Sequence, residues 1–352
     1  MSTSFTSIPI VDFGNLRDPK KKNAELEVLR TAVFDVGFLY LTNTGLEDLI
    51  AETHTALPGI FALPPEQKKS VHMLNSPHFL GYTGLGTETT AKQIDIREVS
   101  NRGVVQDEEA ALTVLQQFDF GTQCIPWKPG DPFWKRLEGP TQFPNDDVKD
   151  LVQRYSTAMT SLGRDFVHFV AESLSLNADV FDQFLGEMSR LKFIKYPPTT
   201  PGSQGVGPHK DSIGLFTFLS QDRVGGLQVL NKSGEWIDAT PIPGSLVVNI
   251  AQGFEAVTGG VCSGTTHRVV APTETTRYSI AFFQAVRLSL RLEELKKTTK
   301  EIVAKIPASD DKKKRAVDFG EAQLRNRIFS HPDVGQKWYP ELYEKYKKQA
   351  LV

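Results

Sequence analysis

Lys192-Phe193-Ile194-Lys195-Tyr196 opens a series of short β segments that decides the fold, because the apolar period changes from helical to two at Leu191. The later segments are 214–220, 227–230, 236–239, 245–250, 266–270 and 278–284. Lys232-Ser233-Gly234 between two of them is typical of a hairpin turn. So many short strands in one stretch predict a closed barrel or a two-sheet jelly roll.

The residues on either side of this series predict helices. Residues 148–170 carry apolar side chains at intervals of three and four, which indicates one long scaffold helix against a sheet. Nearer the N-terminus, one helix is expected to begin at Asp18-Pro19 and another to cover Leu46 to about Leu57, ended by Pro58. Residues 75–145 have weak periodicity and are expected to be mostly loop. The charged tail from Leu290 is expected to be helical.

Within the series, His209 and Asp211 stand two residues apart. On an extended strand two such side chains project to the same face, so both can reach one metal ion. His267, from a distant strand, would complete two imidazoles and one carboxylate, the ligand set that suits non-haem Fe(II) and leaves coordination positions open. A surface strand with a polar face is the alternative for an isolated His-x-Asp. Surface or core roles are expected for the remaining histidines: His54, His72, His78, His168 and His331.

Arg277 and Ser279 form a second pair with the same spacing. A strand would aim the guanidinium and the hydroxyl one way, and together they indicate a clamp for a carboxylate. An ordinary salt bridge is the alternative for Arg277. Inside a barrel, however, an unpaired guanidinium is costly, so this arginine is expected to meet an anion.

These motifs, in this order, resemble the Fe(II)- and 2-oxoglutarate-dependent oxygenases, in the branch that resembles isopenicillin N synthase. Further segments carry the resemblance, which runs from about residue 8 to about residue 290: Ile8 to Phe13, Gly37 to Tyr40, Gly225 to Val229, Trp236, Pro243 to Asn249, His267 to Val269, and Arg277 to Phe283. The resemblance implies an α+β fold, a double-stranded β-helix (jelly-roll) barrel with flanking N-terminal and C-terminal helices. It implies one oxygenase domain over 1–352, divided at about 1–145, 146–185, 190–290 and 291–352.

The resemblance also implies an activity. Fe(II), 2-oxoglutarate as cosubstrate and O2 would together oxidise a C–H bond of a small molecule, by hydroxylation, desaturation or ring closure, with release of succinate and CO2. Specialised metabolism is the expected setting. The implied metal ligands are His209, Asp211 and His267, and the implied 2-oxoglutarate-binding residues are Arg277, Ser279 and Tyr196. A packed core tyrosine remains the alternative for Tyr196.

The resemblance also suggests residues for the substrate pocket. Position relative to the family's pattern suggests Phe283, Tyr82 and Arg97 for its wall, although Phe283 could be core and Arg97 could pair with an acid. The chain also departs from the family in three places. Ile194 stands where the family commonly has an asparagine, and Ala251-Gln252 stand where it commonly has Gly-Asp. Asn43-Thr44-Gly45 lacks the histidine that is common at its middle position. None of these changes touches an expected ligand.

Composition sets limits on the partners. The chain has 352 residues, 39% hydrophobic and 23% charged, with a formal net charge of −2, so nucleic acid and acidic membrane surfaces are not expected partners. Two cysteines and no visible secretory signal favour a reducing, cytoplasmic location. The oligomeric state is left open.

Other functions remain open. A relative could use iron without 2-oxoglutarate, or fragment 2-oxoglutarate to ethylene. From another class, a non-catalytic ligand-binding barrel could keep the fold, and a zinc hydrolase could use the same ligands. The zinc hydrolase offers no role for Arg277 and Ser279.

Overall fold

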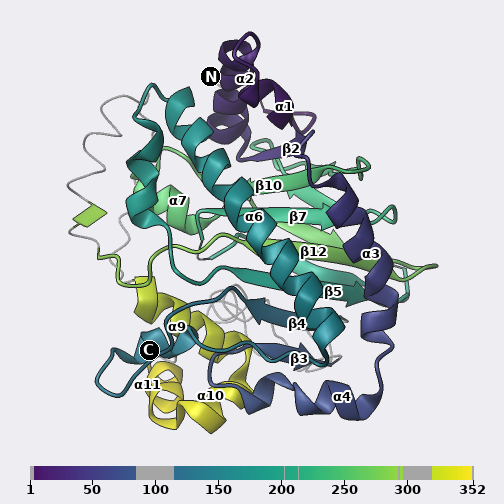
Figure 1. Ribbon diagram of the computed structural model, residues 1–352, viewed down its shortest axis with the longest axis vertical. Coiled ribbons are helices and arrows are strands. Elements are labelled where there is room, and N and C mark those ends of the chain that lie inside the picture. Colours follow the sequence, from purple (N-terminus) through teal and green to yellow (C-terminus); the bar gives the residue numbers. More distant parts are fainter. Residues whose placement is uncertain are drawn as a thin grey trace.

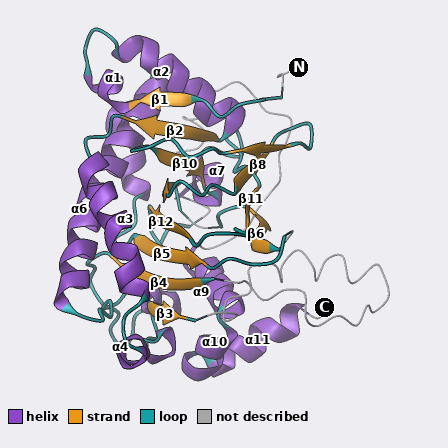
Figure 2. Ribbon diagram, turned by 90° about the vertical axis from the view of Figure 1, so that its right-hand side faces the viewer, coloured by secondary structure: helices purple, strands orange, loops and turns teal. Residues whose placement is uncertain are grey.

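Two facing β-sheets form the centre of the protein in the computed structural model, which describes residues 4–84, 115–201, 203–212, 214–291, 294–295 and 319–350 (Figures 1 and 2). The larger sheet has eight strands in the order β1-β2-β10-β7-β12-β5-β4-β3, and the smaller has four in the order β6-β11-β8-β9. The strands are β1 Ile10–Asp12, β2 Phe38–Thr42, β3 Gly81–Thr83, β4 Gln116–Gly121, β5 Arg190–Tyr196, β6 Gln204–His209, β7 Phe216–Gln221, β8 Leu227–Leu230, β9 Trp236–Asp238, β10 Leu246–Ile250, β11 His267–Val270 and β12 Arg277–Phe283. This arrangement confirms the expected jelly roll.

The long helix α6 (Asp146–Ser173) crosses the outer face of the larger sheet, as Figure 1 shows. Its apolar stripe packs on phenylalanines of the strands, with Phe166 edge-on to Phe216 and Phe218. The Asn145 side chain caps its first turn by accepting from the Val148 amide at 2.9 Å. The predicted scaffold helix therefore forms the support on which the sheet is fixed.

Strand alternation gives the larger sheet two different faces. Odd-numbered residues of β5 such as Leu191 and Phe193 join the core under α6. Even-numbered residues such as Ile194 and Tyr196 join a second core that faces the smaller sheet. The space between the two sheets, the barrel interior, is thus separate from the core beneath α6.

The N-terminal helices differ in detail from the expectation. The helix expected from Asp18 is α2 (Lys22–Thr31) followed by a π-helical turn at Ala32–Val36, and Asp18 instead ends a separate short helix, α1 (Phe13–Arg17). The helix expected to end before Pro58 is α3 (Glu47–Phe61), which contains that proline. Pro58 only removes one N–H, and the buried side chains of Ile60 and Phe61 hold the extra turn against the core.

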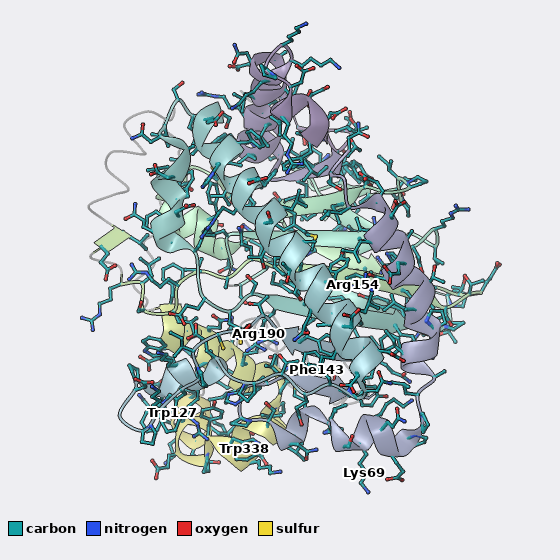
Figure 3. All side chains as sticks on the ribbon, viewed as in Figure 1. Lys69, Trp127, Phe143, Arg154, Arg190 and Trp338 are labelled. Atoms are coloured by element: carbon teal, nitrogen blue, oxygen red, sulfur yellow. The ribbon has the colours of Figure 1, made fainter. Side chains whose placement is uncertain are left out.

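Within the described residues, three 3-10 helices cover Met73–Asn75, Phe133–Leu137 and Ala178–Phe184, and the further α-helices are α4 (Pro65–Ser70), α7 (Gln252–Val257), α9 (Phe319–Ser330), α10 (Pro332–Trp338) and α11 (Pro340–Ala350). The last three pack beside β3 and β4 (Figure 1), and Trp338 Nε1 donates to the Leu74 carbonyl at 3.0 Å. Figure 3 shows Trp127 and Trp338 in this corner, where the Arg136 guanidinium lies over the Trp127 ring and donates to the Trp338 carbonyl. In the described part of the chain, no helix is both long and apolar enough to cross a membrane.

Candidate metal centre

His209, Asp211 and His267 meet at one mouth of the barrel. His209 ends β6, His267 begins β11, and the two are direct partners in the register of these antiparallel strands. Asp211 lies two residues beyond His209, just past the end of the strand. One ligand atom from each of the three lies within 4.8 Å of the others, and Asp211 Oδ1 is 3.6 Å from His209 Nε2 and 3.7 Å from His267 Nε2.

Backbone carbonyls fix the orientation of both imidazoles. His209 Nδ1 donates to the Gly207 carbonyl at 2.7 Å, and His267 Nδ1 donates to the Thr265 carbonyl at 3.1 Å. A carbonyl can only accept, so Nδ1 carries the proton and Nε2 presents its lone pair to the site. Burial, and then the neighbouring His209, lower the pKa of His267 to about 4, although Asp211 opposes this. The imidazole is therefore in the neutral form that binds a metal at pH 7.

Two hydrogen bonds fix the carboxylate of Asp211. Thr217 Oγ1 and Asn249 Nδ2 donate to its Oδ2 at 2.6 and 2.8 Å, which leaves Oδ1 directed at the two imidazoles. Burial would raise the pKa of Asp211, but His267, His209 and the Asn249 amide outweigh it and hold the pKa below its ordinary value. Thr217 and Asn249 were not identified from the sequence as site residues, although Asn249 stands in a segment that carries the family resemblance.

This donor set fits Fe(II). Two imidazoles and one carboxylate on a single side of the site are the ligands of non-haem iron centres that keep coordination positions open for reactants. The hydrogen bonds behind each ligand are those that orient metal ligands in proteins generally. Within the described ranges, these three residues are the ones whose His, Cys, Asp or Glu ligand atoms come together in this way.

Arg277 lies on β12, fully buried on the face toward the barrel interior. Its Nε donates to the Gly225 carbonyl at 2.6 Å and its Nη2 to Gln221 Oε1 at 3.1 Å, while the Tyr196 ring packs 4.7 Å from its guanidinium carbon. Among the described residues, Nη1 of Arg277 and Oγ of Ser279 are buried without a hydrogen-bond partner. Such groups are rare in proteins, because burial without a partner costs free energy. The two donors therefore indicate a place for an acceptor that the described residues do not supply.

The remaining histidines have the structural roles expected of them. His54 Nε2 and Ser220 Oγ are 2.8 Å apart, His78 Nδ1 donates to the Arg136 carbonyl, and His168 Nε2 lies 2.9 Å from Asp182. His72 accepts from a backbone amide, and His331 is buried beside Phe79.

The three residues suggested for the substrate pocket have different outcomes. Phe283 is half-buried and faces the barrel interior, opposite Thr217 in the register. Tyr82 lies on the other face of the larger sheet, where it pairs with Phe118, packs 4.9 Å from its ring and lies against the core under the helices. Arg97 lies outside the described residues.

Known proteins match the chain over nearly its whole length. A family model described as the 2OG-Fe(II) oxygenase superfamily matches residues 186–285, and one described as the non-haem dioxygenase in morphine synthesis N-terminal region matches residues 8–146. The 2-oxoglutarate-dependent dioxygenase frbJ of Dothideomycetidae sp. (strain 11243) is 38% identical over 98% of this chain and 96% of its own length. Homoarginine-6-hydroxylase 2-ODD-C23.2 of Arabidopsis thaliana is 31% identical over 84% of this chain and 82% of its own.

Solved structures agree with these relatives. A full-length Neurospora crassa protein, crystallised in complex with alpha-KG, has a TM-score of 0.71 and 25% identity, covering 91% of this chain and 95% of that one. The same protein has also been crystallised with alpha-KG and thymine, and this second structure has a TM-score of 0.68 and 24% identity. With its jelly roll, its His-Asp-His centre and its relatives, the chain belongs to the 2-oxoglutarate and Fe(II)-dependent oxygenase superfamily and is a 2-oxoglutarate-dependent Fe(II) dioxygenase that oxidises a small molecule.

Proposed function

We propose that this dioxygenase hydroxylates its substrate, with iron held by His209, Asp211 and His267 and the distal carboxylate of 2-oxoglutarate held by Arg277 and Ser279. The observation that carries the proposal is the pair of buried donors, Arg277 Nη1 and Ser279 Oγ, that meet no acceptor among the described residues. A carboxylate would satisfy both at once, and the charge on the guanidinium makes its hydrogen bond about twice as strong as a neutral one.

Strand β7 connects the two ends of this site. Thr217, Leu219 and Gln221 alternate onto the barrel face. Thr217 holds Asp211 at the metal end, and Gln221 holds Arg277 at the other end. The four residue steps from Thr217 to Gln221 span about 13 Å of extended strand. We call the space along this face of β7, between the metal ligands and Arg277, the lane. A dicarboxylate lying in this lane would reach the metal with one end and Arg277 with the other.

The chain's own residues orient and shield the reactants in this proposal. Bound iron and 2-oxoglutarate supply the oxidising chemistry with O2, and the cosubstrate leaves as succinate and CO2. Tyr196 packs on the guanidinium and keeps it flat against the lane. Phe283 stands beside the metal end and would exclude water from the oxidised carbon.

Hydroxylation is favoured over ethylene release because of the relatives. Arabidopsis proteins 31% identical to this chain are named as hydroxylases of homoarginine at position 6. L-Homoarginine is therefore a first candidate substrate, and hydroxylation is the first reaction to test. A non-catalytic barrel would have no use for the hydrogen bonds that orient all three metal ligands.

The test begins without oxygen. Wild type, Arg277→Ala and a control, Arg268→Ala, are loaded with Fe(II) and titrated with 2-oxoglutarate while the visible charge-transfer band is recorded. Arg268 stacks on Trp236 and donates to Gln228, away from the lane, so its loss should leave the titration unchanged. Arg277→Ala should need roughly 100-fold more 2-oxoglutarate, as expected when one partner of a buried charge pair is removed.

Oxygen is then admitted, and succinate, headspace ethylene and hydroxylated L-homoarginine are measured. Succinate without ethylene is the expected result. If ethylene is the main product, the proposed reaction is wrong and the enzyme fragments 2-oxoglutarate instead. Folded, iron-loaded wild type that gives no band and consumes no 2-oxoglutarate would refute the assignment of Arg277 and favour a ligand-binding barrel.

A further inference from the structure

Strands β4 and β5 carry charged side chains on the face that lines the barrel interior. Along β5, Lys192, Ile194 and Tyr196 alternate onto one face, and Tyr196 lies against Arg277 on that face. Asp119 of β4 stands directly opposite Lys192 in the register. Asp119 and Lys192 therefore face the barrel interior, on the same side of the sheet as the lane proposed for 2-oxoglutarate.

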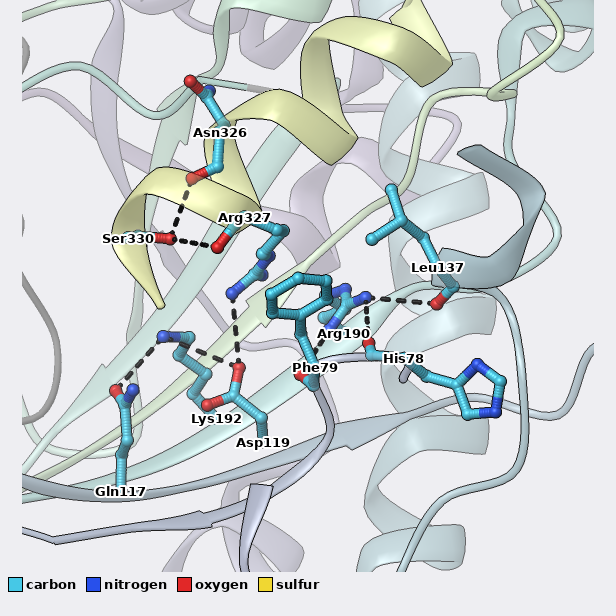
Figure 4. Close-up of polar contacts among 10 residues, drawn as sticks. All are labelled: His78, Phe79, Gln117, Asp119, Leu137, Arg190, Lys192, Asn326, Arg327 and Ser330. Carbon is cyan, nitrogen blue, oxygen red and sulfur yellow. Dashed lines mark hydrogen bonds and ion pairs between the residues drawn. The ribbon is translucent and has the colours of Figure 1, made fainter. Parts of the chain in front are cut away.

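A third charge reaches this pair from the C-terminal part of the chain, as Figure 4 shows. Arg327 of α9 places Nη1 3.7 Å from Asp119 Oδ1, and Lys192 Nζ lies 3.5 Å from the same oxygen. Lys192 Nζ also donates to Gln117 Oε1 at 3.1 Å. Asp119 is fully buried, and the Arg327 side chain is 16% exposed. We call Asp119, Lys192, Arg327 and Gln117 the polar cluster.

The carboxylate of Asp119 lacks the hydrogen bonds that a buried carboxylate needs. Both of its oxygens are buried and accept no hydrogen bond from the described part of the chain, since the two ion pairs are longer than hydrogen bonds to a carboxylate. Such a group is costly, because a carboxylate taken from water is compensated only when its lone pairs are satisfied. The carboxylate is thus an acceptor whose donor must come from outside the described residues.

Arg190, on the same strand and two residues from Lys192, is a buried charge whose hydrogen bonds are satisfied. Its guanidinium donates to the backbone carbonyls of Phe79, His78 and Leu137 at 2.9, 2.9 and 3.2 Å (Figure 4). Burial lowers the pKa of Arg190 to about 9, and those carbonyls accept its hydrogen bonds. Arg190 thus has the acceptors that a buried charge needs, whereas the carboxylate of Asp119 has no donor among the described residues.

The polar cluster lies at a suitable distance from the site of oxidation. Leu219 of β7 pairs with Ala281 of β12, Ala281 with Lys192, and Lys192 with Asp119, so the four form one row across the sheet. Leu219 is the middle residue of the lane. Two strand spacings separate β7 from β5, or about 10 Å, and β4 is one spacing further. A small molecule held at the polar cluster can therefore present a carbon atom to the metal end of the lane.

We propose that Asp119, Lys192 and Arg327 form the recognition subsite for a nitrogen-bearing polar substrate, whose N–H group donates to Asp119 beside the positive charges of Lys192 and Arg327. This inference rests on the proposed function, because it takes the lane for the place of oxidation. It excludes purely apolar substrates, which would bury Asp119 without a donor. Arg327 makes the C-terminal helix α9 part of the substrate site.

The experiment uses wild type, Asp119→Asn and a control, Lys195→Gln, which lies on β5 with its side chain on the opposite face. Each protein is loaded anaerobically with Fe(II) and 2-oxoglutarate, and the band is recorded first. Probes are then added: L-homoarginine, L-arginine and thymine, which carry N–H groups, and 1,3-dimethylthymine and camphor, which carry none. Binding is measured by the shift of the band and separately by equilibrium dialysis.

At least one N–H probe should bind wild type and the Lys195→Gln control equally, and bind Asp119→Asn about 10- to 100-fold more weakly, the range for a hydrogen bond to a charged group. The 2-oxoglutarate band should be the same in all three proteins. Equal binding to wild type and Asp119→Asn, binding only by probes without N–H groups, or no binding by any N–H probe would overturn the inference.

Two further arms keep the result interpretable. If Asp119→Asn does not fold, thymine and 1,3-dimethylthymine are compared on wild type, and equal binding of the two counts against the subsite. If wild type gives no band at saturating 2-oxoglutarate, the proposed function fails. Equilibrium dialysis with the same probes then still tests whether the subsite binds N–H groups.

Discussion

Replacing Thr217 with valine removes one of the two hydrogen bonds that fix Asp211, while it keeps the branched shape of the side chain. The threonine hydroxyl donates to Asp211 Oδ2 at 2.6 Å, and Asn249 donates to the same oxygen at 2.8 Å. With one donor gone, the carboxylate can rotate about its last bond. Its Oδ1 then spends less time directed at the two imidazoles.

The size of the effect follows from the type of bond. A hydrogen bond to a charged group contributes about 1.5–3 kcal/mol, and each 1.4 kcal/mol changes an equilibrium tenfold. Thr217→Val should therefore weaken metal binding about 10- to 100-fold, the range found when a residue behind a metal ligand is replaced. Asn249→Ala should have a similar effect. The double variant should lose less than the sum, because the first change already frees the carboxylate.

Metal affinity is measured by anaerobic calorimetric titration with Fe(II), and with Mn(II) as a probe that does not oxidise. Ser220→Ala is the matched control, since Ser220 lies on the same strand but contacts His54 and not Asp211. Thermal unfolding of the metal-free proteins separates metal affinity from stability. If Thr217→Val binds both metals within twofold of wild type, the argument that this hydroxyl orients Asp211 is wrong.

Two other regions give predictions about stability. Burial, and then the neighbouring carboxylate of Glu187, raise the pKa of Glu138 from 4.5 to about 7. The folded protein therefore holds this proton more tightly than the unfolded chain, and its stability falls as pH rises from about 4.5 to about 7. Glu138→Gln should remove this loss, which solvent screening keeps below about 3.4 kcal/mol at pH 8, and urea unfolding that keeps the wild-type pH slope would contradict the assignment. Gly226→Ala should cost roughly 2–4 kcal/mol of unfolding free energy, because Gly226 has φ +96° and a Cβ there would lie 2.6 Å from the Val270 carbonyl oxygen. In the control Gly225→Ala, φ is +82° but the nearest atom is 3.6 Å away at Pro241, so only backbone strain of about 1 kcal/mol is expected; equal losses would refute the steric argument.

The strands that the sequence predicted well are those with strong apolar alternation. β5 and β12 were expected within two residues of their observed bounds, and β8 was expected at its observed bounds. β6 was not predicted, because Gly205, Gly207 and Pro208 are poor strand formers, and this strand exists through its pairing with β11. β4 was not predicted either, because it lies in a region that was expected to be mostly loop. Tertiary pairing decided both cases, and local preference did not.

The candidate site shows the same division. The metal ligands and Arg277 could be proposed from residue types, spacing and the family resemblance. Thr217 and Asn249 could not be proposed in this way, because their roles depend on which residues of β7 and β10 lie beside Asp211. The sequence of neither strand determines that register. The position of Tyr82 could not be predicted for a related reason. A single alternation step decides which face of β3 it occupies, and that face is the one toward the helices.

The metal ligands and the polar cluster come from different sheets, so metal binding and the proposed substrate recognition can vary separately. Buried charges on the barrel face are costly, and the outer face offsets this cost by burying phenylalanines under α6. The metal ligands come from β6, β11 and the loop after His209, whereas the polar cluster comes from β4, β5 and α9. A change at Asp119 or Arg327 can therefore alter which molecule is held without moving a metal ligand. On this reasoning, substitutions that change the substrate should concentrate at β4, at the barrel face of β5 and at α9.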